Sequence, residues 1–146
     1  MMVNLGSNII NDCDAALIVN GTEVFRLRER ASDGRLICDF DLRNENGDRI
    51  AKIAKDRVVH AAEGYRMHDL PKECYVEDQN GKVVARVQET GHDEITVTGD
   101  FWIEGHHVLI TNDALVSGGV TMSGNIINGF GKAISIDPNS FSIGTV

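Results

Sequence analysis

The sequence lacks the features that identify membrane, secreted and disulfide-rich proteins. Its 146 residues include only two prolines and three cysteines, and no apolar run approaches the ~20 residues of a membrane-spanning helix. The first residues, MMVNLGSN, lack the basic start and apolar stretch of a signal peptide. Cys13, Cys38 and Cys74 are odd in number and have no metal-clip spacing, which is typical of reduced thiols. We therefore expect a soluble, cytoplasmic protein without a membrane partner.

Basic charge is also scarce. The chain has 14 Lys and Arg against 22 Asp and Glu, which gives a formal net charge of -8. Nucleic acid requires a basic face, so it is not expected as a partner. Hydrophobic residues make up 42% and charged residues 25%, as in ordinary globular proteins. The length fits a single domain over residues 1–146.

Catalytic motifs are missing. The sequence contains no G-x-S-x-G elbow, no phosphate-binding Walker loop, no dinucleotide fingerprint and no H-E-x-x-H. This absence lowers the expectation of an enzyme. We assign no catalytic, cofactor-binding or metal-ligating residue from the sequence, and we expect no cofactor.

Glycine, by contrast, is abundant, with 15 residues. Four turn dipeptides separate runs of branched or alternating apolar residues: Asn20-Gly21, Asp33-Gly34, Asn46-Gly47 and Asn80-Gly81. Such pairs favour type I′ turns because both central positions need positive φ. The spacing of the first three dipeptides predicts a meander. Its strands are expected to end at Val19 and then to span 22–30, 35–43 and 48–55.

The strand pattern continues along the chain. RLICDFDLR (35–43) alternates apolar and polar residues with the period of a half-buried strand. EITVTG, DFWIEG and HVLITN read as three further strands. Residues 56–73 are harder to interpret: Val58 to Ala62 fit either a strand or a short helix, and Pro71 ends the element before it. Short, regularly punctuated runs of this kind indicate an all-β fold. We expect a hairpin-rich sandwich, a barrel or a short β-solenoid.

Two hairpin segments resemble each other. FDLRNENGDRIAKIAK (40–55) aligns with CYVEDQNGKVVARVQE (74–89) at an offset of 34. The strand after Asn20-Gly21 follows the same pattern, which gives three equivalent bases: Arg26, Lys52 and Arg86. If the hairpins are neighbours, the bases form a row that contacts an anionic ligand; otherwise they pair with nearby acids such as Glu23 or Glu89.

The two ends of the chain share a second pattern. GSNIINDCDAALIVN (6–20) matches SGNIINGFGKAISID (123–137) at an offset of 117, so that Asn8 meets Asn125 and Asn11 meets Asn128. Each segment resembles one coil of a right-handed parallel β-helix, the fold of polysaccharide lyases and phage tailspikes. This resemblance implies a scaffold only, because none of the catalytic residues of those families has a counterpart here.

One coil cannot bury its faces alone, so each end segment needs a neighbour. In the first arrangement, both segments lie side by side within one chain. In the second, the N-terminal segment of one subunit meets the C-terminal segment of the next, and the two asparagine pairs form amide ladders. Exposed strand edges make a homo-oligomer the expected assembly.

Several polar and aromatic residues are candidates for binding. His106 and His107 point to opposite faces of a strand, so we do not expect them to share a metal with His60, His68 or His92. Two pairs of acids share a face, Asp12 with Asp14 and Asp39 with Asp41; they either solvate a sheet or bind calcium. Trp102 should point away from the core, opposite Phe101 and Ile103. It would then contact a sugar or a protein, unless a loop or a second sheet covers it.

The first hypothesis for the function is a non-catalytic β-rich binding or assembly module with a protein or carbohydrate ligand. The second is a carbohydrate-active enzyme on a β-helix-like scaffold. The third is an acidic inhibitor of a nucleic-acid enzyme.

Overall fold

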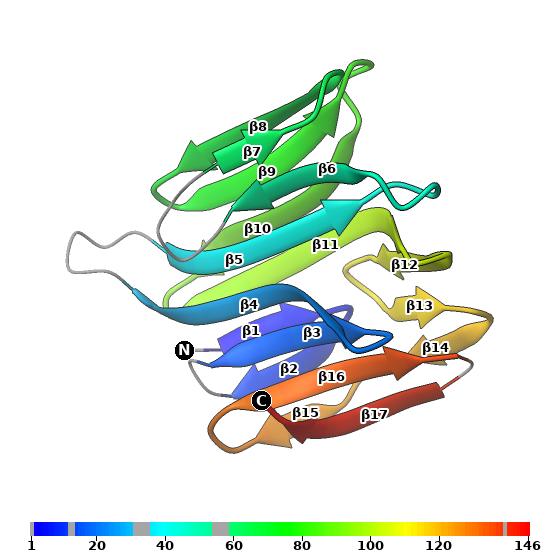
Figure 1. The fold of residues 1–146 in the computed structure, drawn as a ribbon. Coiled ribbons are helices and arrows are strands. Elements are labelled where there is room, and N and C mark those ends of the chain that lie inside the picture. Colours follow the sequence, from blue (N-terminus) through cyan, green and yellow to red (C-terminus); the bar gives the residue numbers. More distant parts are fainter. Residues whose placement is uncertain (1, 12–13, 31–35, 54–58, 139) are drawn as a thin grey trace.

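The computed structural model describes residues 2–11, 14–30, 36–53, 59–138 and 140–146. Within these residues the chain forms seventeen β-strands and no helix (Figure 1). No helix long and apolar enough to cross a membrane is therefore found in the described part of the chain. The strands are β1 (Met2–Leu5), β2 (Asn8–Asn11), β3 (Ala15–Val19), β4 (Thr22–Arg30), β5 (Leu36–Arg43), β6 (Arg49–Ile53), β7 (Val59–Ala61), β8 (Tyr65–Leu70), β9 (Glu73–Asp78), β10 (Val83–Gly91), β11 (Glu94–Ile103), β12 (His106–Ile110), β13 (Leu115–Ser117), β14 (Val120–Met122), β15 (Ile126–Asn128), β16 (Lys132–Asp137) and β17 (Ser140–Thr145).

The strands form two layers. The front layer has the order β7-β6-β5-β4-β3-β16-β17. The back layer has the order β8-β9-β10-β11-β1-β2-β15, and β12, β13 and β14 extend it from the C-terminal half of β11 (Figure 1). A bridge between Trp102 and Arg43 links β11 to β5. The all-β prediction is confirmed, and the architecture is a sandwich rather than a closed barrel.

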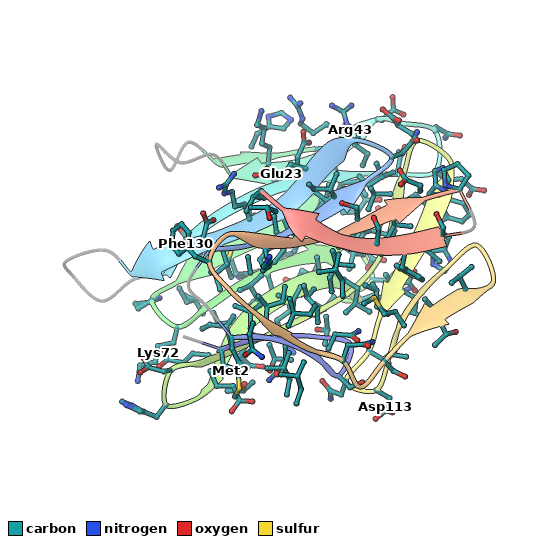
Figure 2. All side chains as sticks on the ribbon, turned by 90° about the horizontal axis from the view of Figure 1, so that it is seen from below. Met2, Glu23, Arg43, Lys72, Asp113 and Phe130 are labelled. Carbon is teal, nitrogen blue, oxygen red and sulfur yellow. The ribbon has the colours of Figure 1, made fainter. Side chains whose placement is uncertain are left out.

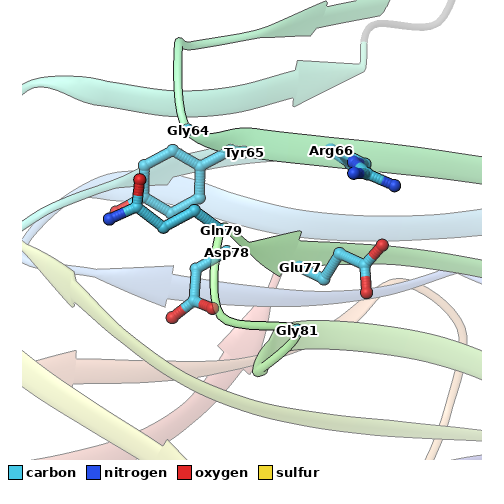
Figure 3. Close-up of a pocket in the computed structure, with 7 residues that line it drawn as sticks. All are labelled: Gly64, Tyr65, Arg66, Glu77, Asp78, Gln79 and Gly81. Carbon is cyan, nitrogen blue, oxygen red and sulfur yellow. The ribbon is translucent and has the colours of Figure 1, made fainter.

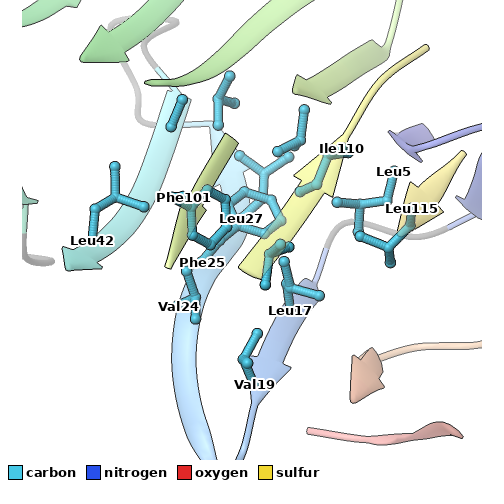
Figure 4. Packing of buried hydrophobic residues seen from close by; sticks show 14 of the residues in the cluster. Leu5, Leu17, Val19, Val24, Phe25, Leu27, Leu42, Phe101, Ile110 and Leu115 are labelled. Carbon is cyan, nitrogen blue, oxygen red and sulfur yellow. The ribbon is translucent and has the colours of Figure 1, made fainter. Parts of the chain in front are cut away.

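The core lies between the layers, and strands such as β1 and β11 contribute to it with alternating residues. In the back layer, Val3 and Leu5 are 0% exposed, while Asn4 between them is only half-buried. In the front layer, Leu17 and Leu27 are also fully buried, and they belong to the same hydrophobic cluster as Phe101 of the back layer (Figure 4). Each such leucine contributes about 1.5–3 kcal/mol by leaving water, which makes this shared core the main source of stability.

The two end segments lie side by side within one chain. β15 pairs parallel with β2, and β16 pairs parallel with β3, each in the register that aligns the matching residues. The first of the two predicted arrangements is therefore confirmed. Each segment crosses from the back layer to the front layer, so the two form stacked strand–bend–strand arches, as in neighbouring coils of a β-helix. Ile134 stacks on Leu17 and Ile136 on Val19, and all four side chains are buried.

The turn predictions are confirmed at one dipeptide and wrong at two. Asn20 and Gly21 have φ of 49° and 78°, as a type I′ turn requires. At Asn46-Gly47 and Asn80-Gly81, by contrast, only the glycines have positive φ. Asp33-Gly34 lies outside the described residues.

An acceptor side chain explains the two wrong turns. The Asn44 side-chain oxygen accepts hydrogen bonds from the backbone N–H groups of residues 46 and 48, at 3.0 Å each. The carboxylate of Asp78 does the same for residues 80 and 82, at 2.9 and 3.0 Å. The side chain two residues before the asparagine therefore closes a longer loop, in which only glycine needs positive φ.

One strand boundary also differs from the predictions, and one open alternative is decided. EITVTG and DFWIEG belong to the single strand β11, which continues through Gly99. A Cβ at Gly99 would lie 2.9 Å from the Phe101 ring, so this glycine makes room for a core side chain rather than ending a strand. In the ambiguous stretch 56–73, the described residues form β7 and β8, and the helix alternative is wrong.

Candidate functional site

Three side chains form a stacked row across the outer face of the back layer. His68 of β8 lies directly opposite Tyr75 of β9, which lies opposite Arg86 of β10. The His68 and Tyr75 rings are stacked, with centroids 4.3 Å apart and 13° between their planes. The Arg86 guanidinium lies 5.1 Å from the Tyr75 centroid. Because β8 and β10 flank β9 on opposite sides, the tyrosine ring is held between the imidazole and the guanidinium.

Two glutamates complete this row. Glu77 lies 2.7 Å from His68 Nε2, and Glu73 lies 2.7 Å from Arg86 Nε. These four side chains are only 21–36% exposed, so their geometry is held by neighbours rather than by solvent. The glutamates balance the bases, and the row has no excess of positive charge.

A second cluster surrounds Trp102 on the same face. Phe101 and Ile103 are buried, at 4% and 0% exposure, and Trp102 between them points outward as predicted. It is half-buried because His107, its neighbour on β12, stacks on it with centroids 4.9 Å apart. Asp100, also on the outer face of β11, is 2.6 Å from His107 Nε2.

Lys82 joins this second cluster from the β9–β10 turn, and its Nζ donates to Asp100 at 2.9 Å. The hydrogen bond from His107, assisted by that from Lys82, holds the pKa of Asp100 below its usual value against the opposing effect of burial. Asp100 in turn raises the pKa of Lys82. Both groups are therefore charged over the neutral range.

The two clusters form one continuous surface. Arg86 lies opposite Thr98 on β11, two residues before Asp100 on the same face, and Lys82 bridges the strands. We call this surface the ring face. It consists of His68, Tyr75, Lys82, Arg86, Asp100, Trp102 and His107.

A cavity of about 400 Å³ borders the ring face, at the β8 end and beside the β9–β10 turn (Figure 3). Its two acidic side chains, Glu77 and Asp78, already make contacts within the fold. Glu77 contacts His68, and the Asp78 carboxylate accepts the backbone N–H groups that close the turn. Tyr65, Asp78 and Gln79 lie together on one side of the cavity in Figure 3. The cavity therefore presents a polar wall whose two carboxylates already have hydrogen-bond partners in the fold.

The predicted row of three bases is wrong. Arg26 on β4 and Lys52 on β6 lie in the front layer, whereas Arg86 on β10 lies in the back layer. Arg26 instead makes two bonds to Asp14, at 3.0 and 3.1 Å, and a longer contact of 3.5 Å to Glu23. Pairing with nearby acids, the alternative interpretation, describes Arg26 and Arg86 better.

The acidic pairs are described only in part. Asp14 is paired with Arg26, and Asp41 with Arg49 at 3.2 Å. Asp12 lies outside the described residues, and so does the side chain of Asp39. Among the residues that the structure describes, no group of three His, Cys, Asp or Glu side chains could hold a metal ion.

The histidines are dispersed as expected. His106 pairs with buried Ile103 and lies on the core side, whereas His107 lies on the outer face. His60 is exposed on β7 of the front layer, and His92 lies at the β10–β11 turn with its side chain 99% exposed. The stacking of His68 on Tyr75 was not predicted. It depends on how β8 pairs with β9, and the sequence pattern does not show which residues of the two strands lie opposite each other. Cys74 is a buried residue of β9.

No family model, no curated protein and no solved structure matches this chain. Its function must therefore be inferred from the site itself.

Proposed function

We propose that the protein is a non-catalytic binding module that recognises another protein through its ring face. The observation that supports this most is the arrangement of Tyr75, Arg86 and Trp102 on one outer face, each held by a stacked or ion-paired neighbour. Tyr, Trp and Arg carry most of the binding energy at protein interfaces. Side chains that are already ordered lose little entropy on binding, which favours affinity.

The same geometry disfavours a sugar ligand. A sugar stacks on a free aromatic face, yet the Tyr75 ring lies between His68 and Arg86, and His107 covers one side of Trp102. At Tyr75 a sugar would have to displace one of these partners, and at Trp102 it could use only the side away from His107. The ring edges and the ion-paired groups remain available, and they suit the mixed polar and aromatic contacts of a protein interface.

The charge balance disfavours an anionic ligand. Lys82 is paired with Asp100 and Arg86 with Glu73, so a phosphate would compete with a carboxylate that is already in place. Binding to nucleic acid depends on bases that are free to replace counterions. A protein partner can use the paired charges as they stand, as hydrogen-bond donors and acceptors at the rim of the interface.

The Asp100–His107 pair resembles part of a catalytic group but lacks the rest. Its histidine contacts Asp100 and Trp102, and no serine, threonine or cysteine of the described residues bonds to it. A nucleophile within hydrogen-bond reach of the base is what such catalysis requires. The pair is better suited to positioning the Trp102 ring.

The test is a comparison of three immobilised proteins as bait: the wild type, Trp102→Ala, and the control Ser135→Ala on the front layer. A partner retained by the wild type and the control is purified, and its affinity is measured by calorimetry. We expect Trp102→Ala to weaken that affinity at least tenfold. Equal affinity for all three baits would contradict the proposal, as would binding of a polysaccharide with loss of affinity in Trp102→Ala.

A further inference from the structure

The edge strand β17 has none of the features that usually protect a sheet edge. It has six residues, SFSIGT, without a charge or a proline, and among the described residues it pairs only with β16. Natural edge strands are commonly short, charged, bulged or interrupted by proline, because an open edge recruits further strands. In the view from below, β17 runs across the front of the molecule (Figure 2). This edge is therefore open to strand addition.

The hydrogen-bond pattern defines which groups point outward. The N–H of Val146 donates to the Gly131 carbonyl at 2.6 Å, so residues 146 and 131 form a hydrogen-bonded pair. Such pairs alternate along an antiparallel ladder. Ser140, Ser142 and Gly144 consequently direct their backbone groups toward β16. The N–H and C=O groups of 141, 143 and 145 point away from the sheet.

The outward groups are self-complementary. A two-fold axis at Ile143 places Ile143 opposite its own copy, and places Phe141 opposite Thr145 of the second strand. All three outward N–H groups of each strand then find carbonyls, which gives about six intermolecular backbone bonds. The Ile143 side chain, 47% exposed in the single chain, is covered by its twin.

Charge also favours a second copy of this chain as the partner that pairs with the open edge of β17. Each chain carries a formal charge of -8, which opposes contact between most pairs of surfaces. The stretch paired by this axis is uncharged, and it is flanked by the exposed apolar side chains of Phe130 and Val146. We propose that two copies of this chain associate through antiparallel pairing of β17, so that the two front layers form one continuous sheet. A two-fold interface of this type is closed and limits the assembly to a dimer.

The test is the mass of the 146-residue chain in solution, measured by light scattering after size exclusion over a range of concentrations. We expect twice the 16.0 kDa of the chain. Ile143→Pro removes an outward N–H and leaves the bonds to β16 in place, so the single chain tolerates it. Ile143→Lys places two positive charges opposite each other. Each variant should raise the dissociation constant at least 100-fold, with an unchanged circular dichroism spectrum.

Gln79→Lys is the matched control, because Gln79 is exposed in the β9–β10 turn, at the end of the molecule opposite β17 (Figure 1), and this variant should retain the dimer mass. Hydrogen exchange of the wild type gives a second readout that needs no substitution. The amides of Phe141, Ile143 and Thr145 should exchange more slowly as the protein concentration rises. A wild-type mass of one chain up to ~1 mM, exchange independent of concentration, or a dimer that persists in both folded Ile143 variants would each overturn the proposal.

Discussion

Replacing Asn8 with alanine should destabilise the protein far more than a typical polar substitution. The side chain is 0% exposed and connects the two arches. Its Nδ2 donates to the carbonyls of Leu5 and Met122, at 2.9 and 3.0 Å, and more weakly to that of Gly6 at 3.2 Å. Its Oδ1 accepts from the backbone and side-chain N–H groups of Asn125, at 3.2 and 2.9 Å. One buried amide therefore serves both ends of the chain.

The expected magnitude follows from these contacts. A net hydrogen bond contributes about 1 kcal/mol, and each buried polar group left without a partner costs a further ~1–3 kcal/mol. Three short bonds and at least one stranded group give about 4–6 kcal/mol for Asn8→Ala. That is a large share of the ~5–15 kcal/mol that stabilises a typical domain.

The assay is urea denaturation followed by circular dichroism, with Asn11→Ala as the control. Asn11 is exposed, and its Nδ2 donates one bond of 2.9 Å, to Asn128 Oδ1 in the second arch. Its replacement should cost less than about 1 kcal/mol, since water can satisfy the exposed partner. If Asn8→Ala is no more destabilising than Asn11→Ala, the buried amide does not hold the arches together and the reasoning is refuted.

Two further predictions concern a turn and a titration. Gly6→Ala should be strongly destabilising, because a Cβ there would lie 2.3 Å from the backbone carbon of Ala114. In the control Gly119→Ala the added Cβ meets nothing within 4 Å, so this variant should lose only the ~1 kcal/mol that its positive φ costs. Thermal melting compares the two variants, and equal losses of stability would contradict the prediction. His107→Ala should raise the pKa of Asp100, because the histidine bond is the largest cause of its depression. Asp100 stabilises the fold fully at a pH above the ordinary carboxyl pKa of 3.8, and this stabilisation is lost as the pH falls through the lower pKa that Asp100 has in the folded protein. The variant should therefore lose this stabilisation at a higher pH than the wild type. Carboxyl NMR titration measures the pKa, and an unchanged value would rule out this role for the histidine.

The arches could be predicted from the sequence because parallel stacking in register places equivalent residues on top of each other. Ile127 lies on Ile10 and Ile134 on Leu17, so side chains of similar size recur at a fixed separation. The asparagine contacts also follow from this register, although they form within one chain and not between subunits. The outward orientation of Trp102 was predictable for a similar reason, since alternation along a strand is a local property.

The ring face could not be predicted in the same way. Alternation indicates that Arg86 points outward, but it does not indicate which layer contains the strand or which strands flank it. The hairpins of Lys52 and Arg86 have similar sequences and lie in opposite layers. The row of His68, Tyr75 and Arg86 depends on the register of three strands. Between β9 and β10 the turn is closed by Asp78, which lies outside the Asn80-Gly81 dipeptide.

The end of the arch stack also determines how the molecule can associate. Parallel arches can in principle add further arches without limit, as in a β-helix or a fibril. Here β17 returns antiparallel and occupies the free side of β16, so a third arch finds a parallel template only at β15, which has three residues. Open-ended growth is thereby blocked, while β17 itself presents an edge that fits its own copy. In the proposed dimer the axis is perpendicular to the front layers, so both back layers lie on the same side of the joined sheet. Both ring faces would then be directed to that side, and two linked sites bind a multivalent partner with greater avidity than either site alone.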